Sequence, residues 1–298
     1  MVATMSIRRA RAELVLDAGA VHGEGPAWDA ASQELLWVDL FGDRLHRMTA
    51  DGRATSEIFD QHVCVAVPRS GGGLVLALGD GIWLQDPDGA RRRVMTLHQP
   101  AGTPIRMNDG KCDPAGRFWA GSMADDETTA GAGTMYRMDP DLSTHEMFRD
   151  VTISNGLAWT GDGRTMFYID TPTRRVDRFD IDPATGAIAN RRTAVSITSE
   201  HGLPDGMTID DEGGLWVAMW KGSAVHRYTQ DGRLDTVVEL PCAKVTSCCF
   251  GGPKLDELYI TTSRYELTDE ERAAQPLAGA LFRFHPGVTG PAAVAFAG

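Results

Sequence analysis

One phrase recurs along the whole chain: a short apolar stretch, a hairpin turn of the D-x-x-G kind, and a strand rich in aromatic residues. It returns about every 40 to 50 residues, a period typical of repeat architectures. Clear copies occupy residues 108–123, 154–170 and 204–220, and weaker copies occupy 24–40, 64–80 and 247–263. Most copies continue into a third short strand, at 44–48, 135–138, 176–180, 225–228 and 281–284. Each copy therefore predicts a small antiparallel sheet.

Six such sheets without long linkers predict an all-β chain, a six-bladed β-propeller formed by residues 1–298 as a single domain. Sustained helical periodicity is absent apart from a possible turn at 269–274, which argues against a Rossmann fold or a TIM barrel. A pair of β-sandwiches is the alternative, and period and copy number fit it poorly. The apolar terminal segments 13–17 and 292–297 are expected to close the ring by sharing a blade.

Net charge and cysteine content limit which partners and which cellular compartment are expected for this chain. The chain carries 41 acidic and 29 basic residues, a net charge of -12, which repels phosphate backbones and anionic headgroups. We expect neither nucleic acid nor membrane as a partner. Without a secretory or membrane-spanning apolar run, a cytoplasmic location is expected. The five cysteines show no zinc-site spacing and are expected to be buried thiols.

Residues at the same phase of each repeat should converge around the propeller axis. Counting back about 10 to 13 residues from the aromatic residue of each second strand aligns the copies, because equivalent positions of structural repeats occupy equivalent places in the fold. Four copies then place polar side chains at the channel mouth, and two place apolar or neutral ones. The polar set is Glu24, Asn108 with Asp109, Asn155 and Asp205; the other copies offer Cys64 or Val65 and Ser247 or Cys248.

Three carboxylates and two amides around one narrow channel repel one another unless a cation lies among them. Their oxygen donors suit Ca²⁺, Mg²⁺ or Mn²⁺ best, with Zn²⁺ or Fe²⁺ still open. Two plainer interpretations compete with a metal site. N-D-G, S-N-G and P-D-G are ordinary turn tripeptides, and a water-filled polar channel fits the same pattern.

The histidines and tryptophans point less clearly to function. His22, His62 and His201 lie near inferred loop ends, where a solvated or hydrogen-bonded surface role is expected. The tryptophans at positions 37, 119 and 216 share one strand phase, which indicates packing within blades. Trp220, just beyond a repeat strand, is within reach of the mouth. The charged loop 264–275 is expected to be solvated surface, with capping of a channel end as the alternative.

At several of these positions the sequence resembles the family of regucalcin (senescence marker protein) and the bacterial gluconolactonases. The resemblance covers nearly the whole chain and is densest at RMNDGKCDPAGRFWAGSM (106–123). It continues at ISNGLAW (153–159), NRR (190–192), PDGM (204–207) and TSCCFGG (246–252). A match of this particularity implies the family's six-bladed propeller and its lactonase chemistry.

The resemblance also implies roles for individual residues. Glu24, Asn155 and Asp205 match the family's metal ligands, and Arg106 and Asn108 match its contacts to substrate hydroxyls. An acidic residue after the G-S-M motif also contacts substrate in the family. Asp126 takes that position here, where regucalcin has Glu, and Glu127 follows it.

The function expected from residues and resemblance together is hydrolysis of a sugar aldonolactone, with one divalent ion as cofactor. Asp205 is expected to accept the proton of the attacking water, and Asp109 is a credible substitute because a ligand role lowers the basicity of Asp205. Two other functions stay open: a non-catalytic calcium-binding regulatory protein, and a phosphotriesterase-like hydrolase using the same Lewis-acid logic. The R-x-N-D-G motif favours a hydroxylated substrate.

Overall fold

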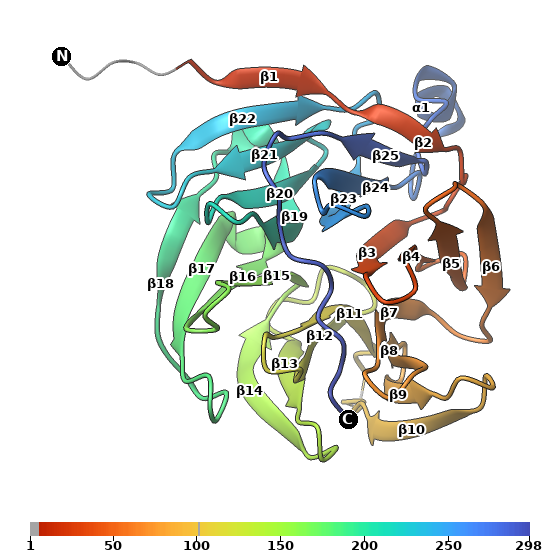
Figure 1. The fold of residues 1–298 in the computed structure, drawn as a ribbon, viewed down its shortest axis with the longest axis vertical. Helices are drawn as coiled ribbons and strands as arrows, with labels where there is room; N and C mark the ends of the chain where they lie inside the picture. Colours follow the sequence, from red (N-terminus) through yellow and green to blue (C-terminus); the bar gives the residue numbers. More distant parts are fainter. Residues whose placement is uncertain (1–5, 101) are drawn as a thin grey trace.

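Six sheets stand around one axis in the computed structural model, which describes residues 6–100 and 102–298 (Figure 1). Each sheet is a blade whose first strand lies innermost, against the innermost strands of its neighbours. The all-β, six-bladed β-propeller predicted from the repeats is therefore confirmed.

The first three blades follow the chain in order. Blade 1 contains β3 (Gly23–Asp29), β4 (Glu34–Asp39), β5 (Arg44–Thr49) and β6 (Ala54–Ile58). Blade 2 contains β7 (Val63–Pro68), β8 (Leu74–Leu78), β9 (Gly81–Gln85) and β10 (Arg91–Thr96). Blade 3 contains β11 (Ile105–Cys112), β12 (Phe118–Ala124), β13 (Gly133–Met138) and β14 (Thr144–Val151).

The other three blades complete the ring and take in the N-terminal strands. Blade 4 contains β15 (Ser154–Trp159), β16 (Thr165–Asp170), β17 (Arg175–Ile181) and β18 (Ile188–Ser196). Blade 5 contains β19 (Leu203–Ile209), β20 (Leu215–Trp220), β21 (Ala224–Tyr228), β22 (Leu234–Glu239) and β1 (Arg8–Arg11). Blade 6 contains β23 (Val245–Gly251), β24 (Glu257–Thr262), β25 (Leu281–Phe284) and β2 (Glu13–Leu16).

Apolar side chains between blades form the core, and the tryptophans predicted to pack there do so. Trp37, Trp119 and Trp216 are almost fully buried. Two of the indole N–H groups find carboxylate acceptors in the hairpin turn of the same blade: Trp119 donates to Asp113 at 3.0 Å and Trp216 to Asp210 at 2.8 Å. These bonds satisfy the one polar atom that indole burial would otherwise leave unpaired.

The N-terminal segment closes the ring. β2 pairs antiparallel with β25 as the outer strand of blade 6, while β1 pairs in parallel with β22 on the outside of blade 5. The expected use of residues 13–17 in closure is confirmed.

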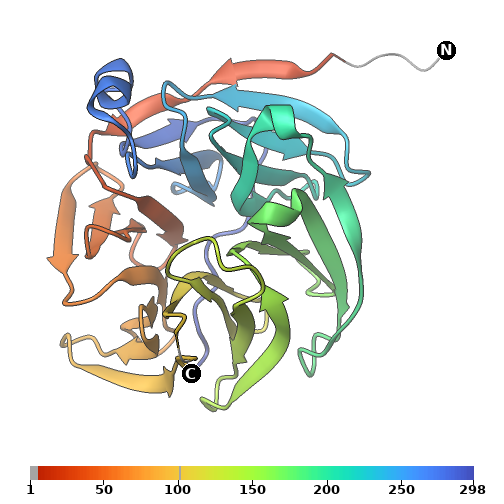
Figure 2. The same cartoon turned by 180° about the vertical axis from the view of Figure 1, so that it is seen from behind.

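The expectation for residues 292–297 was wrong. This tail forms no blade strand; it crosses the channel on the face turned to the viewer in Figure 1 and lies behind the ring in Figure 2. Phe296 is buried between blades 2 and 3, and its backbone bonds to that of Pro68 and Ser70. The tail's apolar residues therefore cover the channel and pack against blades that have all their strands without it.

The helical turns are short. α1 (Asp269–Ala274) confirms the predicted helical turn, and its N-terminus is closed by a capping box between Thr268 and Glu271. None of its residues is buried, so the expected solvated surface holds for the helix. Earlier in the same loop, Leu267 is buried in the core and Tyr265 packs against the ring of His22. Two 3₁₀ turns, η1 (Thr171–Thr173) and η2 (Ser199–His201), follow β16 and β18.

The cysteines are free and buried, as expected. Burial raises the pKa of the Cys64 and Cys249 thiols to about 12, so neither is an activated nucleophile. Within residues 6–100 and 102–298, no helix has the length and apolar character needed to cross a bilayer.

Candidate functional site

All six innermost strands carry a register shift at the same level of the channel. In the polar blades the shift falls at Glu24–Ala27, Met107–Gly110, Asn155–Leu157 and Pro204–Met207. The other two show it at 63–65 and 245–247. A β-bulge interrupts the alternation of a strand and re-aims a side chain. The repeated bulge therefore turns one residue per blade towards the axis.

The glycine after each polar residue belongs to this bulge and not to a hairpin turn. A Cβ on Gly206 would lie 2.1 Å from the hydroxyl oxygen of Ser247, and one on Gly156, whose φ is +20°, would lie 2.7 Å from the Asp205 carbonyl oxygen. Only glycine lets the inner strands of neighbouring blades approach so closely. The plain turn interpretation of S-N-G and P-D-G is therefore excluded.

The structure brings three buried carboxylates to this level: those of Glu24, Asp109 and Asp205. Burial, followed by the charge of Asp109, raises the pKa of Glu24 to about 8. Burial and then the charges of Glu24 and Asp109 raise the pKa of Asp205 well above its usual value. Burial also raises the pKa of Asp109, although Lys111 opposes the shift. The cluster therefore favours either protonation of these acids or a cation among them.

Asn155 is oriented by hydrogen bonds at both ends of its amide. Its nitrogen donates to the hydroxyl oxygen of Thr171 at 2.8 Å, and its oxygen accepts from the side-chain nitrogen of Asn108 at 3.0 Å. The Thr171 hydroxyl donates in turn to the carbonyl oxygen of Pro204 at 2.8 Å. This chain of bonds joins blades 3, 4 and 5 and ends next to Asp205.

Arg106 lies buried beside Asn108 at the mouth. Its guanidinium donates to the side-chain oxygen of Asn108 at 2.7 Å and to the carboxylate of Glu127 at 2.9 Å. Asp125 lies 3.5 Å from its Nε, which has no hydrogen-bond partner in the described structure. Asn108 and Glu127 therefore hold the guanidinium in a fixed position, which suits recognition of a hydroxylated ligand.

Asp126 lies apart from Arg106 in this arrangement. Its exposed carboxylate accepts hydrogen bonds from the backbone nitrogens of Thr128 and Thr129 and from the Thr129 hydroxyl. These bonds lower its pKa to about 2. The structure thus gives Asp126 a role in shaping its loop, and the neighbour that faces Arg106 is Glu127.

His22 occupies the mouth instead of the surface position expected for it. Its side chain is 13% exposed, and its Nε2 lies 3.9 Å from Oε1 of Glu24. Burial, reinforced by Arg106 and Lys244, lowers its pKa to about 3, so the imidazole is neutral. His62, by contrast, is the partly exposed surface histidine expected, paired with Asp43 at 2.7 Å.

Aromatic rings surround His22. The ring centroid of Phe41 lies 5.3 Å from that of His22, Trp220 lies 5.6 Å away and Tyr265 lies 5.9 Å away. Trp220 therefore reaches the mouth, as predicted. The spacing of His22 to Glu24 was the signal that could have found this histidine, because residues two apart on a strand share a face.

The donor set fits a divalent cation. Glu24, Asn155 and Asp205 supply oxygen atoms, and an ion among them would remove the repulsion that raises the pKa values of the two carboxylates. No group of three His, Cys, Asp or Glu side chains in the described residues stands close enough to hold an ion by itself. The Asn155 amide oxygen, placed by Thr171 and Asn108, is therefore an essential part of any such site.

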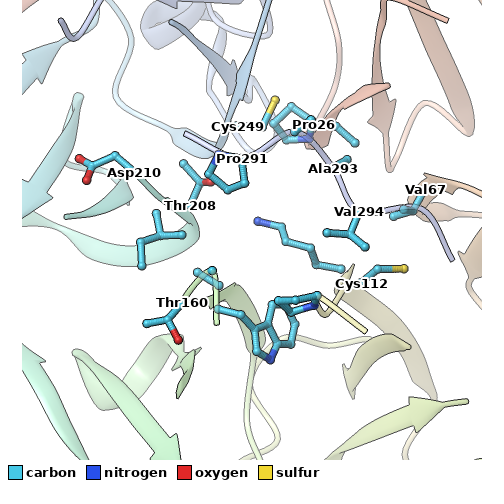
Figure 3. Close-up of a pocket in the computed structure, with 18 of the residues that line it drawn as sticks. Pro26, Val67, Cys112, Thr160, Thr208, Asp210, Cys249, Pro291, Ala293 and Val294 are labelled. Carbon is cyan, nitrogen blue, oxygen red and sulfur yellow. The ribbon is translucent and has the colours of Figure 1, made fainter. Parts of the chain in front are cut away.

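A cavity of about 460 Å³ continues the channel below this level. Asp109 and Lys111 line it, and Lys111 donates to the Met207 carbonyl oxygen at 2.8 Å. Figure 3 shows Pro291, Ala293 and Val294 of the tail following one another across it, from the side of Thr208 to that of Val67. The tail thus crosses the channel on the face opposite the mouth.

Comparison with known proteins matches residues 22–264 to the model of the SMP-30/Gluconolactonase/LRE-like region. Regucalcin of Danio rerio is 39% identical over 266 residues, which cover 88% of this chain and 89% of the relative. YvrE of Bacillus subtilis, whose name assigns it provisionally as a sugar lactone lactonase, is 37% identical over 96% of this chain and 99% of its own. The crystal structure of a calcium-binding regucalcin from Agrobacterium tumefaciens superposes with a TM-score of 0.92 at 28% identity, covering 98% of this chain and 99% of that one.

Proposed function

This chain belongs to the SMP-30/gluconolactonase/LRE-like family, and from that premise we propose that it is a divalent-metal-dependent lactonase which opens a sugar aldonolactone to the aldonic acid. The observation that carries the proposal is the ring of Glu24, Asn155 and Asp205 beside the tethered pair Arg106 and Asn108. One part of this mouth suits a cation, and the adjoining part suits a polyol.

Glu24, Asn155 and Asp205 would hold the ion. When bound, a divalent ion at these oxygens supplies Lewis acidity towards a lactone carbonyl and lowers the pKa of water. Ca²⁺, Mn²⁺, Mg²⁺, Zn²⁺ and Fe²⁺ all accept such a donor set.

Arg106 and Asn108 orient the substrate in this proposal. The guanidinium is fixed by Glu127 and Asn108, so it reaches the ligand with little loss of side-chain entropy. The N–H of its Nη2 atom that is not bonded to Glu127 binds a hydroxyl oxygen of the lactone ring in this proposal. Binding of this kind positions the carbonyl carbon for attack.

Buried carboxylates carry out the proton transfers in this proposal. As water attacks the carbonyl carbon, a carboxylate accepts a proton from it, and the ring C–O bond then breaks. The same proton is returned to the departing ring oxygen, which becomes a hydroxyl group, so the reaction consumes one water and needs no other reactant. Asp205 is the proposed base, and Asp109, whose carboxylate accepts a hydrogen bond from the Gly110 N–H, is the alternative.

An acid-release assay tests the function. Chelator-treated protein is given a panel of aldonolactones with each of the five ions in turn, and a pH indicator follows the acid. Hydrolysis that needs the ion and disappears in Asp205→Ala is the expected result. Folded protein that binds an ion but hydrolyses no lactone would instead support a non-catalytic calcium-binding protein. Turnover of a phosphotriester alone would support the third function.

A further inference from the structure

Lys111 brings a positive charge into the channel but takes no part in the proposed lactone hydrolysis. It lies on β11, two residues after Asp109, and both side chains line the cavity beneath the carboxylates. Of the described residues that line this cavity, Lys111 is the only cation. An ammonium group withdrawn from bulk water needs acceptors and an opposing charge nearby. The contacts of Lys111 therefore indicate its role.

The side chain of Lys111 spans the channel between two blades that are not neighbours. Its Nζ donates to the carbonyl oxygen of Met207 at 2.8 Å, which joins β11 of blade 3 to β19 of blade 5. β15 of blade 4 lies between these two strands around the ring (Figure 1). β19 is the edge strand of its sheet, so its channel side has no strand of that sheet to supply hydrogen-bond donors. The Lys111 ammonium supplies one.

Met207 ends the bulge that turns Asp205 towards the axis, because the register of β19 shifts there. Blade 6 holds one flank of this bulge so closely that a Cβ on Gly206 would lie 2.1 Å from the hydroxyl oxygen of Ser247. β15 of blade 4 packs on the other flank. The remaining side faces the channel, and there the hydrogen bond from Lys111 holds the backbone.

The charge of Lys111 also reaches the carboxylates. Burial raises the pKa of Asp109, and the Lys111 ammonium opposes this rise more than any other group. From the mouth side, Arg106 opposes the rise that burial and Asp109 cause in the pKa of Glu24. The acids thus lie between two cations, and only Arg106 stands where a substrate would enter.

We propose that Lys111 is a positioning residue of the lactonase site: by binding the backbone at Met207, it fixes the direction in which Asp205 presents its carboxylate. The inference rests on the proposed function and adds a residue that touches neither substrate nor ion. It acts through Asp205 and leaves Arg106 and Asn108 in place. Its loss should therefore lower ion affinity and kcat but hardly change KM.

Lys111→Met is the main test, because it nearly keeps the shape of the side chain and removes its charge and its donor. With the ion saturating, kcat is expected to fall about tenfold to a hundredfold, and KM to change less than about threefold. Affinity for Mn²⁺, measured by titration calorimetry, is expected to fall about tenfold. Lys111→Arg keeps a charged donor beside a cavity of about 460 Å³, and it should retain kcat and ion affinity within about threefold of wild type.

Lys254→Met is the matched control, because it removes the same charge from an exposed turn between β23 and β24. It should behave as the wild type does. Equal ion affinity and kcat in Lys111→Met and Lys254→Met, or a loss confined to KM, would overturn the role of Lys111.

A crystal structure of the wild type provides a test that does not depend on folding of the variant. Nζ of Lys111 turned away from the Met207 carbonyl oxygen would overturn the proposal by itself. Wild-type protein that binds no ion and hydrolyses no lactone overturns the proposed function instead, even where this hydrogen bond is present.

Discussion

The side-chain nitrogen of Asn155 donates to the hydroxyl oxygen of Thr171 at 2.8 Å, and this bond decides which end of the amide faces the channel. Because the nitrogen is engaged, the oxygen faces the channel, and its lone pair that Asn108 does not use remains for a ligand. Thr171→Val keeps the shape and removes the acceptor, so the amide loses its fixed orientation. We expect metal affinity to fall about tenfold, as for other partners that orient metal ligands. Titration calorimetry with Mn²⁺ measures it; unchanged affinity would show that the amide orientation does not matter.

A matched control for this change lies two residues away. The Thr173 hydroxyl donates to the Asp170 carbonyl oxygen at 2.6 Å and makes no bond to Asn155. Thr173→Val should therefore leave the Mn²⁺ affinity as it is in the wild type.

Asp205→Asn should abolish ion binding and lactone turnover together, because one carboxylate serves both. It should also raise the Tm of chelator-treated protein at pH 8, since the charges of Glu24 and Asp109 no longer act on a third buried acid. Calorimetric titration, the acid-release assay and a thermal melt give the three readouts. A variant that retains wild-type ion affinity would remove Asp205 from the proposed ligands.

Arg106→Ala should raise KM by roughly tenfold to a hundredfold and lower kcat less. The reason is that charge-assisted hydrogen bonds worth about 1.5–3 kcal/mol are lost from substrate binding, while the carboxylates stay in place. Steady-state kinetics on the best lactone of the panel separates the two parameters. Equal losses in Arg106→Ala and Asp205→Asn would contradict this division of roles.

Glu127 and Asp126 provide a paired test of the acidic loop. Glu127 bonds to Arg106, whereas Asp126 bonds only to its own loop at Thr128 and Thr129. Glu127→Gln should therefore raise KM about threefold to tenfold by loosening Arg106. Asp126→Asn should leave KM unchanged and only loosen the loop around Thr128 and Thr129. The reverse pattern would restore Asp126 to the substrate-binding role implied by the family resemblance.

His226 predicts a pH dependence of stability far from the mouth. Burial and then the charge of His201 lower the pKa of His226 to about 4, from an ordinary value of 6.5. The unfolded chain takes up this proton below about pH 6.5, and the folded protein takes it up only near pH 4. Stability from this group is therefore complete above pH 6.5 and declines as pH falls to about 4. Thermal melts of His226→Gln should show a shallower decline than those of the wild type.

A histidine in a different setting serves as the control for that experiment. His145 is half-exposed and pairs with Asp139 at 3.0 Å. His145→Gln should follow the acid profile of the wild type more closely than His226→Gln does. If both variants have the wild-type slope, burial of His226 is not a source of acid sensitivity.

Much of the fold could be predicted from the sequence because each blade repeats the same short pattern of turns and apolar residues. The aromatic phase of Trp37, Trp119 and Trp216 aligned the copies, and the aligned polar residues do meet at one level of the channel. The β-bulge could not be predicted from the sequence, since it depends on contact between the inner strands of neighbouring blades. N-D-G and P-D-G consequently resembled turns, although the structure places them inside β11 and β19.

The site residues that lie outside the repeated pattern could not be located from the sequence alone. His22 was expected at the surface, but the loops that carry Phe41 and Tyr265 enclose it. Thr171 lies in a 3₁₀ turn, and only its position beside blade 5 makes it a support for Asn155. Glu127 and Asp126 are adjacent, and the sequence does not show which of them faces Arg106; in the folded loop, where Glu127 has a left-handed φ of 58°, it is Glu127 that bonds to Arg106.

Both ends of the described chain fasten the ring, β2 on blade 6 at its edge and the tail across the channel to blades 2 and 3. During synthesis β1 and β2 emerge before the other strands described here, but their partner strands β22 and β25 emerge only after the intervening blades. The nascent protein must therefore carry unpaired edges until residues 281–297 leave the ribosome, and ring closure is a late event in its production. If the protein were made as two separate fragments, the propeller would form only if β2 could still pair with β25 and the tail could still bind to blades 2 and 3.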